Sequence, residues 1–364
     1  MKKTISYIEV HQPIGTFYLC ALPAMDLLSI VDVDQRSSVN HDGVQRERSK
    51  SRVAEIGRYC SDPDAVFPTP IVVSVNEDNS KLINIDEKNH TISYETNIKL
   101  GSVLDGQHRL WGIAESEYKD KFILPVVFMF GLNKEEEAYI FATINSNQTK
   151  VSVSLIYDLF ENSKYHSPQK TAHYIARVMN SDKDSPFYGR LKMLGKKEDG
   201  QENAILSQGT FAKAILSLIS RNPKDDMINV KRGETLERDS SRPLRDYYIA
   251  EKDAVIAKIL YNCFNALRMV FPEEWEKPQD NVLWKTTGFL GIIRAFPNMY
   301  ELGLRRKTLD EKFFLICFEA FQRKLKEKNI ALNSNDFPGG SEQNQARLAK
   351  VLTESLNDIE WKNE

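Results

Sequence analysis

The chain has 364 residues, of which 41% are hydrophobic and 27% charged, as in an ordinary globular protein. Two domains are expected at this length. The formal net charge of −2 excludes a protein coated with basic residues, so any nucleic-acid surface must be local. No apolar run approaches the roughly 18 residues that span a membrane, and the N-terminus lacks a signal-peptide core. We therefore expect a cytoplasmic protein with no membrane partner.

The cysteines and histidines give no metal-binding pattern. The four cysteines are scattered without a Cys-x-x-Cys pair, which argues against a zinc ribbon, an iron–sulfur cluster and a disulfide framework. Searches for a Walker-A loop, GxGxxG, His-Glu-x-x-His and Gly-x-Ser-x-Gly find nothing. We predict no metal site, and the residues alone establish no cofactor. Five isolated histidines are expected on the surface or in the core rather than as ligands: His11, His41, His90, His166 and His173.

The first half of the chain alternates strand and helix patterns. β-branched, aromatic and apolar runs predict strands, and the run at 123–130 is apolar enough to be buried on both faces. A short helix is predicted over 23–33. The predicted strands cover residues 7–10, 15–21, 71–75, 82–86, 91–95, 98–104 and 123–130.

A basic helix is predicted between the first strands and the strand at 71–75. From Val44 to Arg58 five Lys or Arg side chains stand against two Glu, while Val53 and Ile56 point inward. We interpret this helix as a source of DNA phosphate contacts, and a solvated helix face is the alternative. The candidate contacts are Gln45, Arg46, Arg48, Lys50 and Arg52.

The most informative stretch is Leu-Asp-Gly-Gln-His-Arg-Leu-Trp-Gly at 104–112. An apolar strand runs into Asp105-Gly106, a tight-turn dipeptide, and a helix starts at once. Such a junction presents free backbone N–H groups and a positive helix end, and a neighbouring Arg and His favour phosphate. Asp105 could be a metal ligand, an acid/base group or an acceptor that positions Arg109; the alternative for the whole stretch is an ordinary turn. We predict a phosphate or nucleotide site at Gly106, Gln107, His108 and Arg109.

A second polar stretch follows the next helix. Asn133 is expected to cap that helix, with Glu136 as its capping-box partner. The helix ends in Ile144-Asn-Ser-Asn-Gln-Thr-Lys, whose amides can read base edges and whose Lys can contact phosphate. A helix C-cap and linker is the alternative. The candidate DNA contacts here are Asn145, Asn147, Gln148 and Lys150.

Beyond residue 150 the patterns become helical. Ser152 is expected to cap the first of these helices, and Ser207 or Thr210 a later one. The stretch from Arg221 to Asp246 mixes many charges with few apolar residues and predicts a mobile surface loop, with ordering on DNA as the alternative. The expected fold class is therefore α+β, with a mixed α/β domain at 1–150 and an all-helical domain at 151–364. The helices are expected over residues 153–160, 168–179, 211–219, 245–270, 282–296, 309–326 and 341–356.

The pentapeptide Asp105-Gly-Gln-His-Arg109 resembles the signature of the DGQHR-domain family, which includes the DndB-like proteins of DNA phosphorothioation gene clusters. Three further stretches fit the family pattern in the expected order, at 43–46, 67–75 and 144–151, and a weaker likeness lies at 207–211. The resemblance implies a core similar to the ParB/sulfiredoxin-like nucleotide-binding fold, in which the turn after the strand holds nucleotide phosphates.

The resemblance also implies a function. It points to a DNA-binding protein of a bacterial DNA-modification and antiviral defence system, acting as a DndB-type transcriptional regulator on double-stranded DNA. The alternative is a nucleotide-hydrolysing or DNA-nicking enzyme of a 7-deazaguanine system. That enzyme would use Asp105 and His108 as catalytic residues, with an NTP and Mg²⁺ as cofactor. A homo-oligomer is compatible with either reading.

Overall fold

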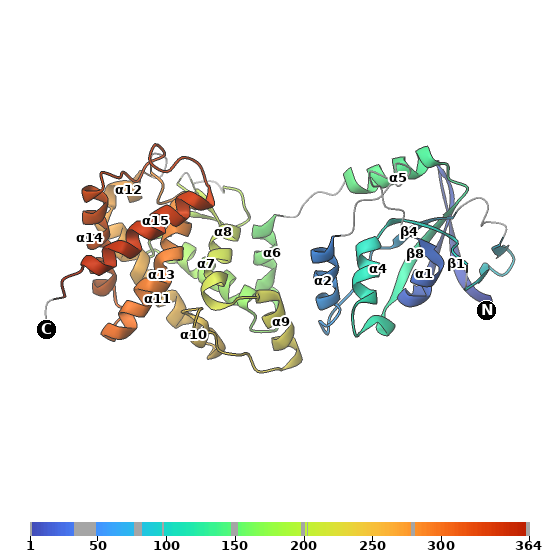
Figure 1. The fold of residues 1–364 in the computed structure, drawn as a ribbon, viewed down its shortest axis with the longest axis horizontal. Helices are drawn as coiled ribbons and strands as arrows, with labels where there is room; N and C mark the ends of the chain where they lie inside the picture. Colours follow the sequence, from blue (N-terminus) through green and yellow to red (C-terminus); the bar gives the residue numbers. More distant parts are fainter. Residues whose placement is uncertain are drawn as a thin grey trace. The chain divides into compact units, whose positions relative to one another are not determined.

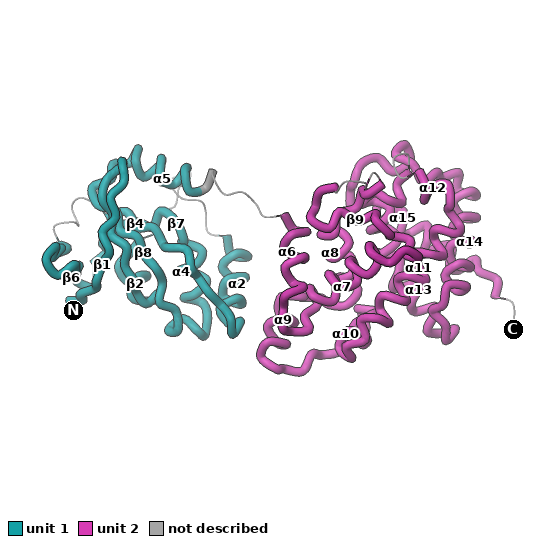
Figure 2. The backbone as a smooth tube through the Cα atoms, turned by 180° about the vertical axis from the view of Figure 1, so that it is seen from behind, with its two compact units in different colours: residues 1–150 teal, residues 151–364 magenta. Residues whose placement is uncertain are grey.

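The computed structural model describes residues 2–32, 49–75, 82–96, 98–146, 152–197, 201, 203–277 and 281–361. The chain divides into two compact units, Met1–Lys150 and Val151–Glu364 (Figure 2). Each unit has its own hydrophobic core. The buried members of one core lie between Tyr7 and Phe128, and those of the other between Tyr157 and Leu356.

The N-terminal unit is built on a mixed sheet of eight strands in the order β3-β7-β4-β8-β2-β1-β6-β5. The β4–β8 and β3–β7 pairs are parallel, and the other pairs are antiparallel. The predicted alternation of strand patterns is confirmed, with β4 and β8 at the expected bounds. The strands are β1 (Lys2–Gln12), β2 (Gly15–Pro23), β3 (Val31–Asp32), β4 (Ile71–Val75), β5 (Asn84–Asp86), β6 (Thr91–Glu95), β7 (Gly101–Asp105) and β8 (Ile123–Phe130).

Helices cover both faces of this sheet (Figure 1). On one face, α1 (Ala24–Ile30) and α4 (Gln107–Ala114) bury their apolar side chains against Ile71, Val73 and Phe128, and α2 (Lys50–Tyr59) packs on α4. On the other face lies α5 (Lys134–Ser146). Its predicted capping box is confirmed: Asn133 N–H donates to Glu136 Oε2 over 2.9 Å, and Glu136 N–H donates to Asn133 Oδ1 over 3.0 Å.

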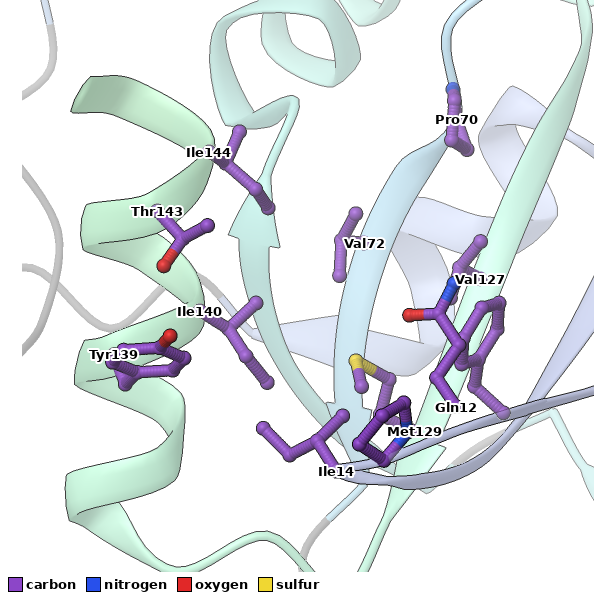
Figure 3. A pocket seen from close by; sticks show the side chains of 12 residues that line it. Gln12, Ile14, Pro70, Val72, Val127, Met129, Tyr139, Ile140, Thr143 and Ile144 are labelled. Carbon is purple, nitrogen blue, oxygen red and sulfur yellow. The ribbon is translucent and has the colours of Figure 1, made fainter. Parts of the chain in front are cut away.

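An apolar groove of about 510 Å³ separates α5 from the sheet. In Figure 3 the side chains of Ile140 and Ile144 extend from α5 toward Val72 and Met129 on the strands. Pro70, just before β4, also lines it. The groove arises because strand side chains alternate between faces, so Val72 points to α5 while its neighbours Ile71 and Val73 enter the core under α4.

The C-terminal unit is mostly helical. Its core is rich in aromatic side chains, with Phe187 in edge-to-face contact with Phe264 and Trp284. None of the described helices combines the length and apolar character that crossing a membrane requires. The helices are α6 (Val153–Leu159), α7 (Pro168–Ser181), α8 (Gln208–Ile219), α9 (Pro223–Arg232), α10 (Arg245–Ile249), α11 (Asp253–Val270), α12 (Pro272–Glu276), α13 (Thr286–Arg306), α14 (Glu311–Glu327) and α15 (Glu342–Ser355).

The structure corrects two expectations for this unit. It is not entirely helical, because β9 (Leu191–Lys192) and β10 (Leu206–Ser207) form a short parallel pair, too brief to leave an alternating pattern in the sequence. The run expected as one helix over 245–270 is two helices, α10 and α11. They are separated at Ala250–Lys252, where Glu251 adopts a positive φ of 54°.

The prediction of a mobile loop from Arg221 to Asp246 is wrong. The stretch contains α9 and then a connection anchored by Arg245, whose side chain is 7% exposed and pairs with Asp226. Arg242 also donates to the Ser217 carbonyl over 2.8 Å. The charge count suggested a solvated segment because it could not reveal that two of these charges neutralise each other inside the fold.

Candidate functional site

The strand–turn–helix junction predicted at Asp105 is confirmed. Strand β7 ends at Asp105, and α4 begins at Gln107. Gly106 between them has φ +96°, a left-handed conformation that glycine adopts without strain. A Cβ atom at this position would lie 2.3 Å from Cδ1 of Ile71, so the close packing of the turn also favours a residue without a side chain.

Arg109 and Asp105 form a clamp across this turn. Nη2 of Arg109 lies 2.8 Å from Oδ2 of Asp105 and also donates to the Pro70 carbonyl over 3.1 Å. Nη1 donates to the carbonyl and the hydroxyl of Thr69, at 2.5 and 2.6 Å. The Arg109 side chain is only 17% exposed. Both terminal nitrogens are thus engaged by the protein itself, and the clamp ties the turn to the segment that enters β4.

The basic helix α2 lies against α4 beside this turn. Ser49 caps it, with its hydroxyl accepting from the Arg52 N–H over 3.4 Å, and Val53 is buried beneath it. Glycines make the close approach possible: a Cβ on Gly112 would stand 2.5 Å from Cβ of Ile56. At the start of α2, the side chains of Lys50, Ser51 and Arg52 are exposed.

His108 joins the two helices. Its Nε2 accepts a hydrogen bond from the Ser49 backbone N–H over 3.4 Å, and its ring meets Trp111 edge-on at 5.8 Å. Accepting through Nε2 requires a lone pair there, so the ring is neutral and carries its proton on Nδ1. Burial lowers the pKa of His108, the nearby Arg52 lowers it further, and Asp105 acts in the opposite direction.

The structure describes some of the predicted site residues, and several of these lie close together. Others fall outside the described residues. Lys50 and Arg52 share the first turn of α2 near His108. Gln107 is buried, and its Oε1 accepts no hydrogen bond from the described residues. Asn145 lies in the last turn of α5. Outside the described residues fall the predicted DNA contacts Gln45, Arg46, Arg48, Asn147, Gln148 and Lys150.

Two contributors to the site were not singled out as such in the sequence. Ser49 supplies the N–H that His108 accepts, and Thr69 holds Arg109. Both had a signal: Ser49 has the residue type and position of a helix N-cap, and Thr69 belongs to the Phe-Pro-Thr-Pro stretch that fits the family pattern. The sequence did not show which residues they contact. Ser49 and His108 are 59 positions apart in the chain, and Thr69 and Arg109 are 40 positions apart.

The stretch at 207–211 has a packing role in the structure. Ser207 caps α8, as expected, and the Gln208 amide nitrogen lies 2.7 Å from Nδ1 of buried His173. The Gly209 N–H donates to the Ser154 hydroxyl over 3.1 Å, which fastens α6 to α8.

The described residues contain no group of three or more His, Cys, Asp or Glu side chains suited to a metal ion.

Comparison with known proteins supplies the family. The family model for DndB, described as DNA-sulfur modification-associated, matches residues 6–308, which include the turn, α2 and most of the C-terminal unit. No curated protein and no solved structure matches the chain. Since the match extends over well more than half of the sequence, the chain belongs to the DndB, DNA-sulfur modification-associated family.

Proposed function

We propose that this chain is a DNA-binding protein of a bacterial DNA sulfur-modification system, where it acts as a DndB-type transcriptional regulator. Membership of the family supports the link to DNA sulfur modification. The proposal includes a ParB/sulfiredoxin-like assignment for the N-terminal unit and double-stranded DNA as the partner.

The juxtaposition of the start of α2 with the first turn of α4 carries the proposal. Lys50 and Arg52 are exposed there, and the Ser49 N–H lies 3.4 Å from Nε2 of His108. Helix N-termini attract phosphate because their N–H groups and dipole face outward, and Lys and Arg add charge. A basic surface confined to one place also agrees with a net charge of −2.

The proposal keeps the remaining predicted DNA contacts. Gln45, Arg46 and Arg48 precede α2 in the sequence. Asn145 lies in the last turn of α5, and Asn147, Gln148 and Lys150 follow this helix in the sequence. We assign the basic residues to phosphates and the amides to base edges, because amide groups pair with base edges while cations pair with the backbone.

The double variant Lys50→Ala/Arg52→Ala tests the surface. We expect weaker binding to every duplex, and each lost phosphate contact should lower the salt slope of log affinity by about 1. Fluorescence anisotropy over a salt series, with promoter and scrambled duplexes, measures both. The control Lys213→Ala/Lys312→Ala removes equal charge from exposed positions of the C-terminal unit. An unchanged slope in the first variant would contradict the assignment.

A further inference from the structure

His108 is placed to change its hydrogen bonding when an anion arrives. In the structure its Nε2 accepts from the Ser49 N–H, so both groups are occupied by each other. A proton on Nε2 would end this bond, because an N–H cannot accept. The result would be two donors, Nε2–H of His108 and N–H of Ser49, at the start of α2.

The charges around the ring decide when that proton is favourable. Arg52 on α2 opposes a positive ring, whereas Asp105 at the end of β7 favours it. Asp105 is already paired with Arg109 on the same helix as His108. A phosphate near Arg52 would offset that repulsion and would accept from both released donors.

We propose that His108 takes up one proton when a DNA phosphate binds at the start of α2, and that the imidazolium then donates to this phosphate. The inference rests on the DNA-binding function proposed above and deepens it. The proton comes from solvent and forms the Nε2–H bond, and no other covalent bond changes. Arg109 is not the phosphate donor in this inference. Its terminal nitrogens already donate to Thr69, Pro70 and Asp105, so we assign it to positioning the turn.

Proton uptake makes affinity depend on pH. The free ring has a pKa below its ordinary value, and a bound phosphate raises it. Between these two pKa values, binding takes up one proton at His108. The affinity for DNA therefore falls by up to about tenfold for each unit of rising pH. Internucleotide phosphates keep a constant charge over this range, so the duplex itself contributes no slope.

The experiment compares the full-length wild type with His108→Gln, using a fluorescent DNA duplex at constant ionic strength across about pH 5.5–8.5. Glutamine can still accept from the Ser49 N–H but cannot take up a proton. We expect a falling affinity with rising pH in the wild type and a flat profile in the variant. His11→Gln, which changes an exposed histidine of the same unit, should keep the wild-type slope.

A second measurement does not depend on the variant folding. NMR titration of the wild-type histidine rings, with and without duplex, should show the pKa of His108 rising on binding. An unchanged pKa, or equal slopes in the wild type and His108→Gln, overturns the inference. Binding that needs Lys50 and Arg52 but does not vary with pH overturns only the role of His108. Absence of duplex binding at every pH overturns the proposed function as well.

Discussion

The Asp105–Arg109 pair joins the first and last residues of the signature pentapeptide. Among the alternatives for Asp105, the 2.8 Å contact to Arg109 favours the acceptor that positions the arginine. A catalytic metal usually needs several ligands, and within the described part of the chain no suitable group surrounds this carboxylate.

Asp105→Asn tests this positioning role. The amide keeps the shape and one acceptor but loses the charge, so we expect a loss of about 1 kcal/mol in the free energy of unfolding. Duplex affinity should stay near the wild-type value, because the variant loses a negative charge near the phosphates but also loses the charge that favours a protonated His108. Urea denaturation and anisotropy measure the two quantities. Mg²⁺-dependent nicking or NTP hydrolysis by the wild type, absent from the variant, would favour the enzyme alternative instead.

His166 is a second histidine with a defined partner. Its Nε2 lies 3.0 Å from both carboxylate oxygens of Asp253, and the Thr171 hydroxyl lies 3.1 Å away. Its ring stacks on Tyr248. The hydrogen bond to Asp253 raises the pKa of His166, and burial opposes this effect.

The raised pKa predicts how stability depends on pH. The folded state binds the His166 proton more tightly than the unfolded state, so this stabilisation is fully present below pH about 6.5 and is lost as pH rises through the raised value. Tryptophan fluorescence in urea, for the wild type and His166→Asn, should give curves that converge with rising pH. The difference between the curves is the relevant quantity, because buried His173, whose pKa is lowered, contributes the opposite trend to both. Parallel curves would contradict the prediction.

The contact between α2 and α4 shows how two helices are matched to bring the site together. Gly112 and Gly57 face each other's helix, with Gly112 O 3.3 Å from where a Gly57 Cβ would stand. The absence of side chains allows the backbones to approach closely, and this approach brings Ser49 within reach of His108.

Gly112→Ala should therefore destabilise the N-terminal unit even though alanine favours helix. The new Cβ would lie 2.5 Å from Cβ of Ile56 and 3.0 Å from the Val53 carbonyl oxygen. The first atom is bonded to the α2 backbone and the second belongs to it, so neither can move aside unless the helix moves. Overpacking of this kind costs about 1–3 kcal/mol. Urea denaturation followed by circular dichroism measures the loss. Gly340→Ala, where an added Cβ meets nothing within 4 Å, is the control and should stay within about 0.5 kcal/mol of wild type.

In the molecule as a whole, the separate cores of the two units predict that each can fold alone. The larger core is confined to Tyr157–Leu356, and α14 and α15 belong to it although they lie beyond the family match at residue 308. A fragment of residues 151–364 should give a strongly helical circular dichroism spectrum with cooperative unfolding. A substantial strand signal, or a fragment of residues 151–308 that unfolds as cooperatively, would contradict this division.

Local pattern was enough to place most elements of this chain. β-branched and apolar runs predicted β4, β6 and β8 at their observed bounds. Side-chain chemistry predicted the caps at Asn133 and Ser152, and it offered Ser207 or Thr210 for the helix that Ser207 caps. Asp-Gly predicted the turn into α4. These features depend on neighbours within a few residues, so a linear reading contains the information that specifies them.

The pairings that give the site and the C-terminal unit their character have no such local signal. Arg109 meets Thr69, and Ser49 meets His108, only because β4, β7, α2 and α4 pack together. Arg245 meets Asp226, 19 positions earlier in the chain, only because the fold brings α9 and α10 within hydrogen-bonding distance at these residues. The sequence around a charged residue does not show whether its side chain is solvated or paired with a residue far along the chain. Only the long-range packing of the folded chain decides between the two.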